Sequence, residues 1–160
     1  AKVGLTVEHA FQVGRLLGWD YGEKNKPERC RVVIGKDTRR SSYMFEYSLV
    51  AGLTASGADV YLLHVTTTPS VSYVVRTEGF HCGIMISASH NPFYDNGIKV
   101  INSMGYKLEA SVEEQTEAYI DGKTEELPLA VRENIGRTVD FSAGRNRYIG
   151  YLISFPTRSF

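Results

Sequence analysis

A polar stretch between two apolar runs carries the residues of this chain that are best suited to chemistry. Residues Ser87–Lys99 hold hydroxyl, imidazole, amide and carboxylate groups and end on a lysine, and the apolar runs Gly83–Ile86 and Ile98–Ile101 flank them. A segment that leaves a buried strand and becomes polar is where an open α/β sheet usually places its ligand site. A plain turn is the alternative, because Asn, Pro, Asp, Gly and Ser all favour turns.

Phosphoryl transfer is the chemistry that these residue types fit best. It needs an oxygen to carry the phosphoryl group, cations to hold its charge, and an acid or base to serve the acceptor hydroxyl. Ser89 could be the carrier oxygen. Lys36, Arg39 and Lys99 could supply the cations, and Lys99 could also act as the base.

Other chemistries fit less well. A hydrolytic triad of Ser89, His90 and Asp95 is formally available, but neighbouring residues rarely face each other well enough, and the Gly-x-Ser-x-Gly elbow is missing. Metal-only catalysis is poorly supported, because Asp37, His90 and Asp95 are scattered and no two carboxylates have ligand spacing. No Gly-x-x-x-x-Gly-Lys-Ser/Thr loop is present, so a nucleotide P-loop is not expected.

A basic loop, Lys36–Ser42, follows a short β-branched run. Residues Arg31–Gly35 predict a buried strand, and the next segment leads into a helix capped by Ser41 or Ser42 and ended by Gly57. The N-terminus of a helix carries free N–H groups and partial positive charge, which suits an oxyanion such as phosphate. A solvated basic loop is the alternative interpretation.

The order of the elements predicts an α/β fold. The first helix begins after Thr6 and runs to about Trp19, a loop follows over 21–28, and a short helix begins at Pro69 with Thr68 as its N-cap. Strands over 31–35, 60–65 and 83–86 alternate with these helices, which predicts a mixed, mostly parallel sheet of about four strands sandwiched between helices. The three loops after the strands would then gather on one side. Residues 98–101 and 106–108 predict an antiparallel hairpin at the edge of the sheet.

The rest of the chain is less informative. An acidic helix is expected from Ser111 to about Tyr119, a polar linker over 121–133, and a last helix from about Ala143. We expect one compact domain over residues 1–138, with 139–160 as a linker and the opening helix of a second domain.

The bulk composition excludes several classes of protein. Eighteen basic and eighteen acidic residues cancel, and no long apolar span occurs, so neither a nucleic acid nor a membrane is expected as a partner. Two isolated cysteines suggest reduced thiols in a cytoplasmic protein. The chain lacks a signal-peptide pattern and an initiator Met, so we expect a piece of a larger chain.

Several segments together resemble one known family. The sequence of Gly83–Pro92 resembles the phosphoserine signature of the α-D-phosphohexomutases, and Phe93–Lys99 looks like the members that act on glucosamine phosphates. Gly35–Arg39 is similar to the family's first active-site loop, Thr66–Pro69 to its Thr-Pro turn, and Ser142–Ile149 to the opening of its second domain.

The resemblance implies a mutase of the isomerase class that interconverts glucosamine 6-phosphate and glucosamine 1-phosphate, for cell-wall precursors. Ser89 would be the phosphoserine, would pass its phosphate to the sugar through a bisphosphorylated intermediate, and would bind Mg²⁺ through that phosphate. Lys99 and Arg39 would serve proton transfer or charge stabilisation. His90 and Asn91 would shape the loop. His90 would also be one of the catalytic residues, and Asn91 and Lys36 would contact the phosphate or the substrate.

The departures from the family pattern limit this expectation. The metal-binding Asp-x-Asp-x-Asp-Arg loop, the sugar-reading loop and the C-terminal phosphate-binding domain are absent from this sequence. The piece alone should therefore be inactive. Its expected partners are a hexosamine phosphate and the remaining domains of the same chain, with a homodimer as a further option. A mutase of the same family acting on phosphoglucose or phosphomannose, and a non-catalytic domain of the same fold, are the alternatives.

Overall fold

The computed structural model describes residues 6–87, 97–108 and 127–155. The acidic helix expected over 111–119 lies outside the described residues. In chain order the elements are α1 (Val7–Lys24), β1 (Arg31–Lys36), α2 (Arg40–Ala55), β2 (Asp59–Val65), α3 (Thr68–Glu78), β3 (Cys82–Ile86), β4 (Ile98–Asn102), a short 3₁₀ helix (Arg132–Asn134), β5 (Thr138–Asp140) and α5 (Ser142–Ser154).

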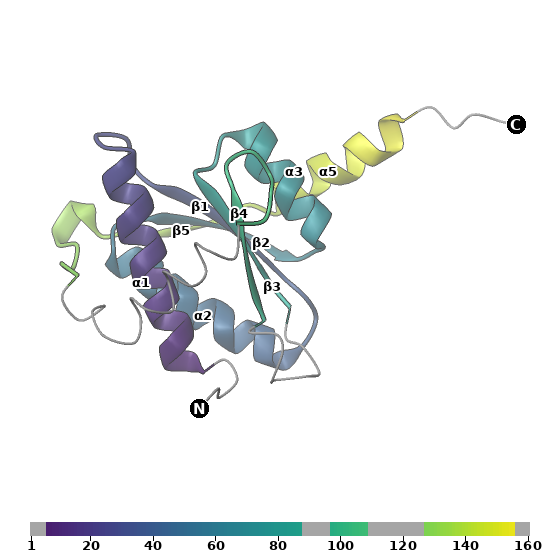
Figure 1. Cartoon of the computed structure of the whole chain (residues 1–160). Coiled ribbons are helices and arrows are strands. Elements are labelled where there is room, and N and C mark those ends of the chain that lie inside the picture. The colour runs from purple at the N-terminus through teal and green to yellow at the C-terminus, as the bar shows by residue number, and fades with distance from the viewer. Residues whose placement is uncertain (1–5, 88–96, 109–126, 156–160) are drawn as a thin grey trace, which may run out of the picture.

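The strands form one mixed sheet in the order β4-β3-β1-β2-β5 (Figure 1). The neighbours β3–β1, β1–β2 and β2–β5 are parallel, and β4 runs antiparallel to β3. This confirms the predicted mixed, mostly parallel sheet. The sheet has a fifth strand, β5, that the sequence analysis did not predict, because three residues are too few to show a periodic pattern.

The predicted edge hairpin is present. The chain turns after β4, where the Asn102 side-chain oxygen accepts hydrogen bonds from the amides of Met104 and Tyr106, both at 3.0 Å. The returning segment 106–108 pairs with β4 through an antiparallel bridge between Ile101 and Lys107. Two backbone hydrogen bonds flank this bridge, from the Asn102 amide to the Tyr106 carbonyl oxygen at 2.7 Å and from the Leu108 amide to the Val100 carbonyl oxygen at 2.9 Å. The antiparallel hairpin predicted for 98–101 and 106–108 is therefore confirmed.

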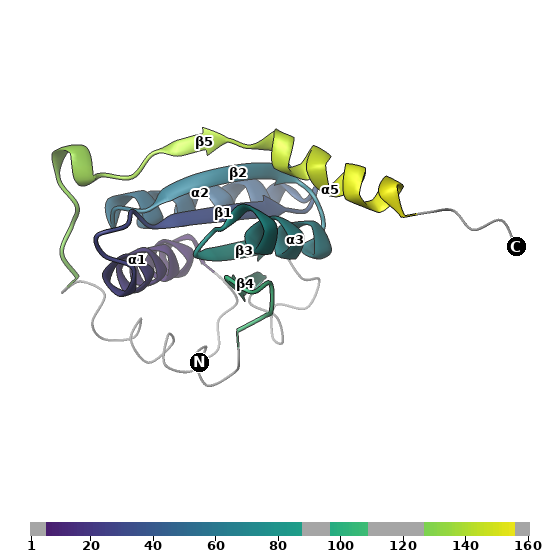
Figure 2. The same cartoon turned by 90° about the horizontal axis from the view of Figure 1, so that it is seen from above.

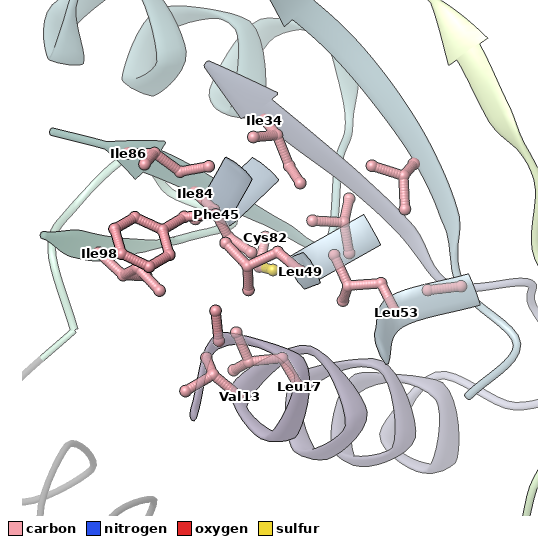
Figure 3. Close-up of a cluster of buried hydrophobic side chains, with 14 of the residues drawn as sticks. Val13, Leu17, Ile34, Phe45, Leu49, Leu53, Cys82, Ile84, Ile86 and Ile98 are labelled. Carbon is pink, nitrogen blue, oxygen red and sulfur yellow. The ribbon is translucent and has the colours of Figure 1, made fainter. Parts of the chain in front are cut away.

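Helices cover both faces of the sheet (Figure 2). Helices α1 and α2 lie on one face, where their apolar stripes pack on β-strand residues such as Ile34, Ile84 and Ile86 (Figure 3). Helix α3 covers the other face, where Val71, Val74 and Val75 join a second cluster. Helix α5 packs against α3 through Tyr73 and Tyr151, whose rings stack with centroids 4.5 Å apart. Its C-terminal end extends beyond the sheet in Figure 1.

Three predicted element ends were wrong by small amounts. Helix α1 continues to Lys24, because Gly22 costs a helix only about 1 kcal/mol and a Lys24–Asp20 ion pair at 2.8 Å supports the last turn. Helix α2 has Arg39 as its N-cap and not Ser41 or Ser42. Helix α3 is capped by Thr67 and not by Thr68. Both threonines could cap a helix, and the Thr67 hydroxyl is the one that accepts a hydrogen bond from the Ser70 amide.

None of the described helices is long and apolar enough to cross a membrane.

Candidate active site

The carboxyl ends of β1, β2 and β3 meet at one edge of the sheet. There the amide of Asp37 donates to the carbonyl oxygen of Ile86 at 3.0 Å, and the amide of Thr66 donates to the carbonyl oxygen of Lys36 at 2.9 Å. Backbone hydrogen bonds therefore continue one residue past each strand and join the starts of the three loops. The predicted convergence of these loops is confirmed for their first residues.

The polar stretch is described only at its two ends. The amide of Ser87 donates to the carbonyl oxygen of Gly97 at 2.8 Å, so the chain leaves β3 and enters β4 at the same place. The predicted site residues Ser89, His90 and Asn91 lie outside the described residues. Their roles therefore stay predictions.

Asp37 organises the loop after β1. Its Oδ1 accepts hydrogen bonds from the Arg39 amide at 3.1 Å and from the Ser42 hydroxyl, and its Oδ2 lies 3.6 Å from the Arg39 Nε. This network fixes Arg39 at the N-cap of α2 with its guanidinium partly exposed. The N-cap side chain of α2 makes no capping hydrogen bond and its first turn holds no acidic residue, so the Asp37 carboxylate, just before the helix, is the negative charge that faces the positive helix end.

Lys36 reaches the same edge but turns its ammonium into the protein. Its Nζ lies 3.0 Å from Oε1 and 3.1 Å from Oε2 of Glu46 on α2, and both side chains are almost fully buried. The Nζ also lies 4.5 Å from the centroid of the Tyr43 ring. The structure thus shows an ion pair at the position where a phosphate contact was expected from the sequence.

Glu46 was not among the residues predicted from the sequence, although a signal was available. Glu46 lies on the buried stripe of α2 with Phe45, Leu49 and Leu53, and all four are less than 9% exposed. A charged residue at a core position is informative, because a buried charge requires a partner.

The two candidate lysines lie on opposite faces of the sheet. In the strand register, Lys36 is paired with Ile86, which is paired with Ile98 in the cluster under α1 and α2. Lys99 is paired with Met85, which belongs to the cluster under α3. Residues that are paired on neighbouring strands point their side chains to the same face of the sheet. Both lysines are therefore near the same edge, but their side chains leave the sheet in opposite directions.

The loop after β2 is packed closely against β1. A Cβ built on Gly35 would lie 2.6 Å from Thr66 Cγ2 and 2.7 Å from Val71 Cγ2, so only glycine fits there. On the other side of β2, the Arg145 guanidinium donates to the carbonyl oxygen of Val65 at 2.9 Å. Arg145 thus ties the start of α5 to the site edge, a role that the sequence did not reveal.

An exposed pair connects β2 to β5 near this edge. His64 has a φ of 66°, and its Nε2 lies 3.0 Å from Oδ1 of Asp140. The hydrogen bond with His64, followed by one from the Ser142 amide, lowers the pKa of Asp140. The pair links β2 to Asp140, the last residue of β5.

The described residues do not form a metal site of their own. No group of three or more His, Cys, Asp or Glu side chains that could hold a metal ion occurs in the parts of the chain that the structure describes.

The sequence matches a known family over most of its length. The family model described as "Phosphoglucomutase/phosphomannomutase, alpha/beta/alpha domain I" matches residues 1–127. The chain is 75% identical over 160 residues to a phosphoglucosamine mutase of Lachnoclostridium phytofermentans and 69% identical over 160 residues to one of Lachnospira eligens. It covers 35% and 36% of those proteins, so it spans about a third of the length of these relatives.

Solved structures support the same fold. A phosphoglucomutase/phosphomannomutase family protein of Burkholderia thailandensis aligns with a TM-score of 0.76 at 21% identity, over 96% of this chain and 33% of that protein. A putative phosphomannomutase of Thermus thermophilus aligns with a TM-score of 0.67 at 25% identity, over 94% of this chain and 32% of that protein. The chain therefore belongs to the phosphoglucomutase/phosphomannomutase family and carries its α/β/α domain I.

Proposed function

We propose that this chain is the N-terminal part of a phosphoglucosamine mutase, a cytoplasmic isomerase that interconverts glucosamine 6-phosphate and glucosamine 1-phosphate. The observation that carries the proposal is the match over the entire chain, at 75% and 69% identity, to two proteins of that name. The edge where β1, β2 and β3 end supports it, because the stretch that contains Ser89 begins there, and the amide of Ser87 donates to the carbonyl oxygen of Gly97 on either side of that stretch.

In the proposed reaction, Ser89 carries the phosphoryl group. The bond between phosphorus and the Ser89 oxygen breaks as a sugar hydroxyl attacks the phosphorus. The hydroxyl proton passes to a base, and the leaving Ser89 oxygen takes up a proton to become a hydroxyl again. The sugar is then bisphosphorylated, reorients, and returns its other phosphoryl group to Ser89. No net phosphate is consumed, so the reaction is an isomerisation.

The other predicted residues take roles around that transfer. Lys99 is proposed as the base, and Arg39 at the N-terminus of α2 as the cation that stabilises charge on the moving phosphoryl group. The Asp37 network supports the role of Arg39, because it holds the guanidinium at the positive end of a helix. His90 and Asn91 are proposed to shape the loop around Ser89 and to contact the phosphate.

Mg²⁺ is the metal that we propose for the complete enzyme. When bound, it would neutralise charge on the phosphoryl group. From this chain Ser89 would contribute through its phosphate, and the carboxylate ligands would come from other parts of the longer protein. We propose that residues 1–138 are the phosphoserine domain and that 139–160 lead into a second domain. The 160-residue piece alone is then expected to be inactive, and a homodimer stays a prediction.

The test is intact mass measurement and phosphosite mapping on the full-length protein, together with turnover of glucosamine, glucose and mannose phosphates. We expect phosphate on Ser89, loss of that phosphate and of activity in Ser89→Ala, and preference for the glucosamine phosphates. Ser103→Ala is the matched control, because Ser103 is an exposed serine in the turn after β4. A phosphate on another residue, or unchanged activity in Ser89→Ala, would contradict the proposal. Preference for glucose or mannose phosphate would assign the protein to the alternative substrate class.

A further inference from the structure

The buried ion pair between Lys36 and Glu46 joins the end of β1 to the second turn of α2. Lys36 is 2% exposed and Glu46 is 3% exposed. Both carboxylate oxygens lie within hydrogen-bond distance of the ammonium. Of the two ends of α2, the pair is nearer the N-terminal end, where Arg39 lies.

Stability of the fold does not account for a pair in this environment. Removing two charges from water costs several kcal/mol per ion, and well-packed apolar residues of similar volume often stabilise a protein equally well or better. Breaking such a pair by changing one partner is costly, because it leaves an uncompensated buried charge. What the pair does define is geometry: it holds the end of β1 against the second turn of α2.

The backbone connects the ion pair to the site. The carbonyl oxygen of Lys36 accepts a hydrogen bond from the Thr66 amide. The amide of the next residue, Asp37, donates one to the carbonyl oxygen of Ile86. Asp37 then binds the Arg39 amide and the Ser42 hydroxyl through its carboxylate. A shift of α2 relative to β1 would therefore be transmitted to Arg39 through two side-chain ties, one at Lys36 and one at Asp37.

The pair also determines which cation can face a phosphate. Glu46 neutralises the ammonium of Lys36 inside the layer between the sheet and α2, while the Arg39 guanidinium stays partly exposed. We propose that Glu46 is a positioning residue for phosphoryl transfer: by pairing with Lys36 it fixes β1 against α2, and thereby fixes Arg39. This assigns Lys36 to positioning and not to direct phosphate binding, and it rests on the proposed function.

The test compares four variants of the full-length protein: Glu46→Gln, Lys36→Met, the double variant Lys36→Met/Glu46→Leu, and Arg15→Met. Arg15 is the matched control, because it is a buried cation (4% exposed) that binds the opposite end of α2, through the carbonyl oxygen of Ala55 at 3.3 Å and the hydroxyl of Ser56 at 2.8 Å. Amide hydrogen exchange at Arg39 and Ser42, urea unfolding, and kcat and KM are measured for each variant.

We expect faster exchange at Arg39 and Ser42 in both pair-breaking single variants, and kcat lower by about 100-fold with KM within about threefold. The double variant, which restores a neutral apolar contact, should recover most of the lost kcat and of the exchange protection. Arg15→Met should lose stability in urea without a change in exchange at Arg39 and Ser42 beyond that global loss.

Two results would overturn the inference. If Glu46→Gln exchanges at Arg39 and Ser42 as Arg15→Met does, the pair does not position the loop. If Glu46→Gln keeps full activity while Lys36→Met and the double variant are equally impaired, Lys36 contacts the phosphate directly. Exchange needs no turnover, so it tests the positioning role even if the unchanged protein shows no mutase activity, and that activity assay tests the proposed function separately.

Discussion

The amide of Asp37 donates a hydrogen bond to the carbonyl oxygen of Ile86 at 3.0 Å, which joins the loop after β1 to the strand that leads toward Ser89. Asp37 lies outside the strand β1, yet it continues the ladder between β1 and β3. The loop that carries Arg39 and the polar stretch Ser87–Lys99 therefore begin next to each other, joined by a backbone hydrogen bond. Asp37 therefore contacts β3 through its amide and the Arg39 loop through its carboxylate, so changing this side chain tests the site directly.

Asp37→Ala should reduce the proposed mutase activity of the full-length protein much more than Asp37→Asn. Asparagine keeps an oxygen that can accept from the Arg39 amide and the Ser42 hydroxyl, and it loses only the charge beside the Arg39 guanidinium. Alanine loses the whole network and should cost about 1–3 kcal/mol, because the buried Ser42 hydroxyl is left without that acceptor. Activity and urea unfolding of both variants check this, and equal activity of the two would contradict it.

Two glycine-to-alanine changes in helices should have opposite effects on stability. A Cβ on Gly52 in α2 would lie 2.1 Å from the carbonyl oxygen of Phe11 in α1, whereas a Cβ on Gly22 in α1 meets nothing within 4 Å. Gly52→Ala should lower the free energy of unfolding by about 1–3 kcal/mol, because the two helices must separate. Gly22→Ala should raise it by about 0.5 kcal/mol. Chemical denaturation measures both, and a stabilising Gly52→Ala would contradict the close α1–α2 packing.

The two cysteines should be unreactive in the folded protein. Burial raises the pKa of the Cys30 thiol to about 12 and that of the Cys82 thiol well above its usual range. At about pH 8, a disulfide reagent such as DTNB should therefore label neither thiol until denaturant unfolds the chain. Fast labelling of either thiol in the native protein would contradict the buried placement.

The same thiols predict a loss of stability in alkali. A raised pKa in the folded state stabilises the protein fully below the pKa of the unfolded thiol, about 8.5, and this stabilisation is lost as the pH rises toward the folded value. The free energy of unfolding should thus fall above about pH 8.5. Replacing both cysteines by alanine should remove this fall in the free energy of unfolding between about pH 8 and pH 9.5. Tyrosines in the unfolded chain ionise mainly above this range, so they contribute little to the change measured there.

The Asp140 carboxyl should titrate at a lower pH in the unchanged protein than in a His64→Gly variant. His64 lowers the pKa of Asp140 through a hydrogen bond, and glycine tolerates the φ of 66° at this position. A lowered carboxyl pKa stabilises the folded state above the unfolded pKa of about 3.9, and this stabilisation is lost as the pH falls through the folded value. NMR titration of the carboxyl in both proteins measures the shift, and equal titration would contradict the pairing.

Local pattern was enough to predict the alternation of strands and helices in this protein. Runs such as Val32–Ile34 and the stripe of Phe45, Leu49 and Leu53 show period and composition within a few residues, and short connections between them imply a parallel sheet. The same reasoning located the edge where the loops begin. The identity of the family was also readable, because its signature residues are contiguous in the sequence.

Only the tertiary structure decided what the individual charges do. Strand β5 exists because its three residues fill the free edge of β2, a partner that is distant in sequence. Lys36 and Lys99 face opposite sides because the strand register sets the direction of each side chain, and a shift of one residue would reverse it. Lys36 is paired with Glu46 because helix α2 folds back over β1, and neither residue type alone predicts that contact.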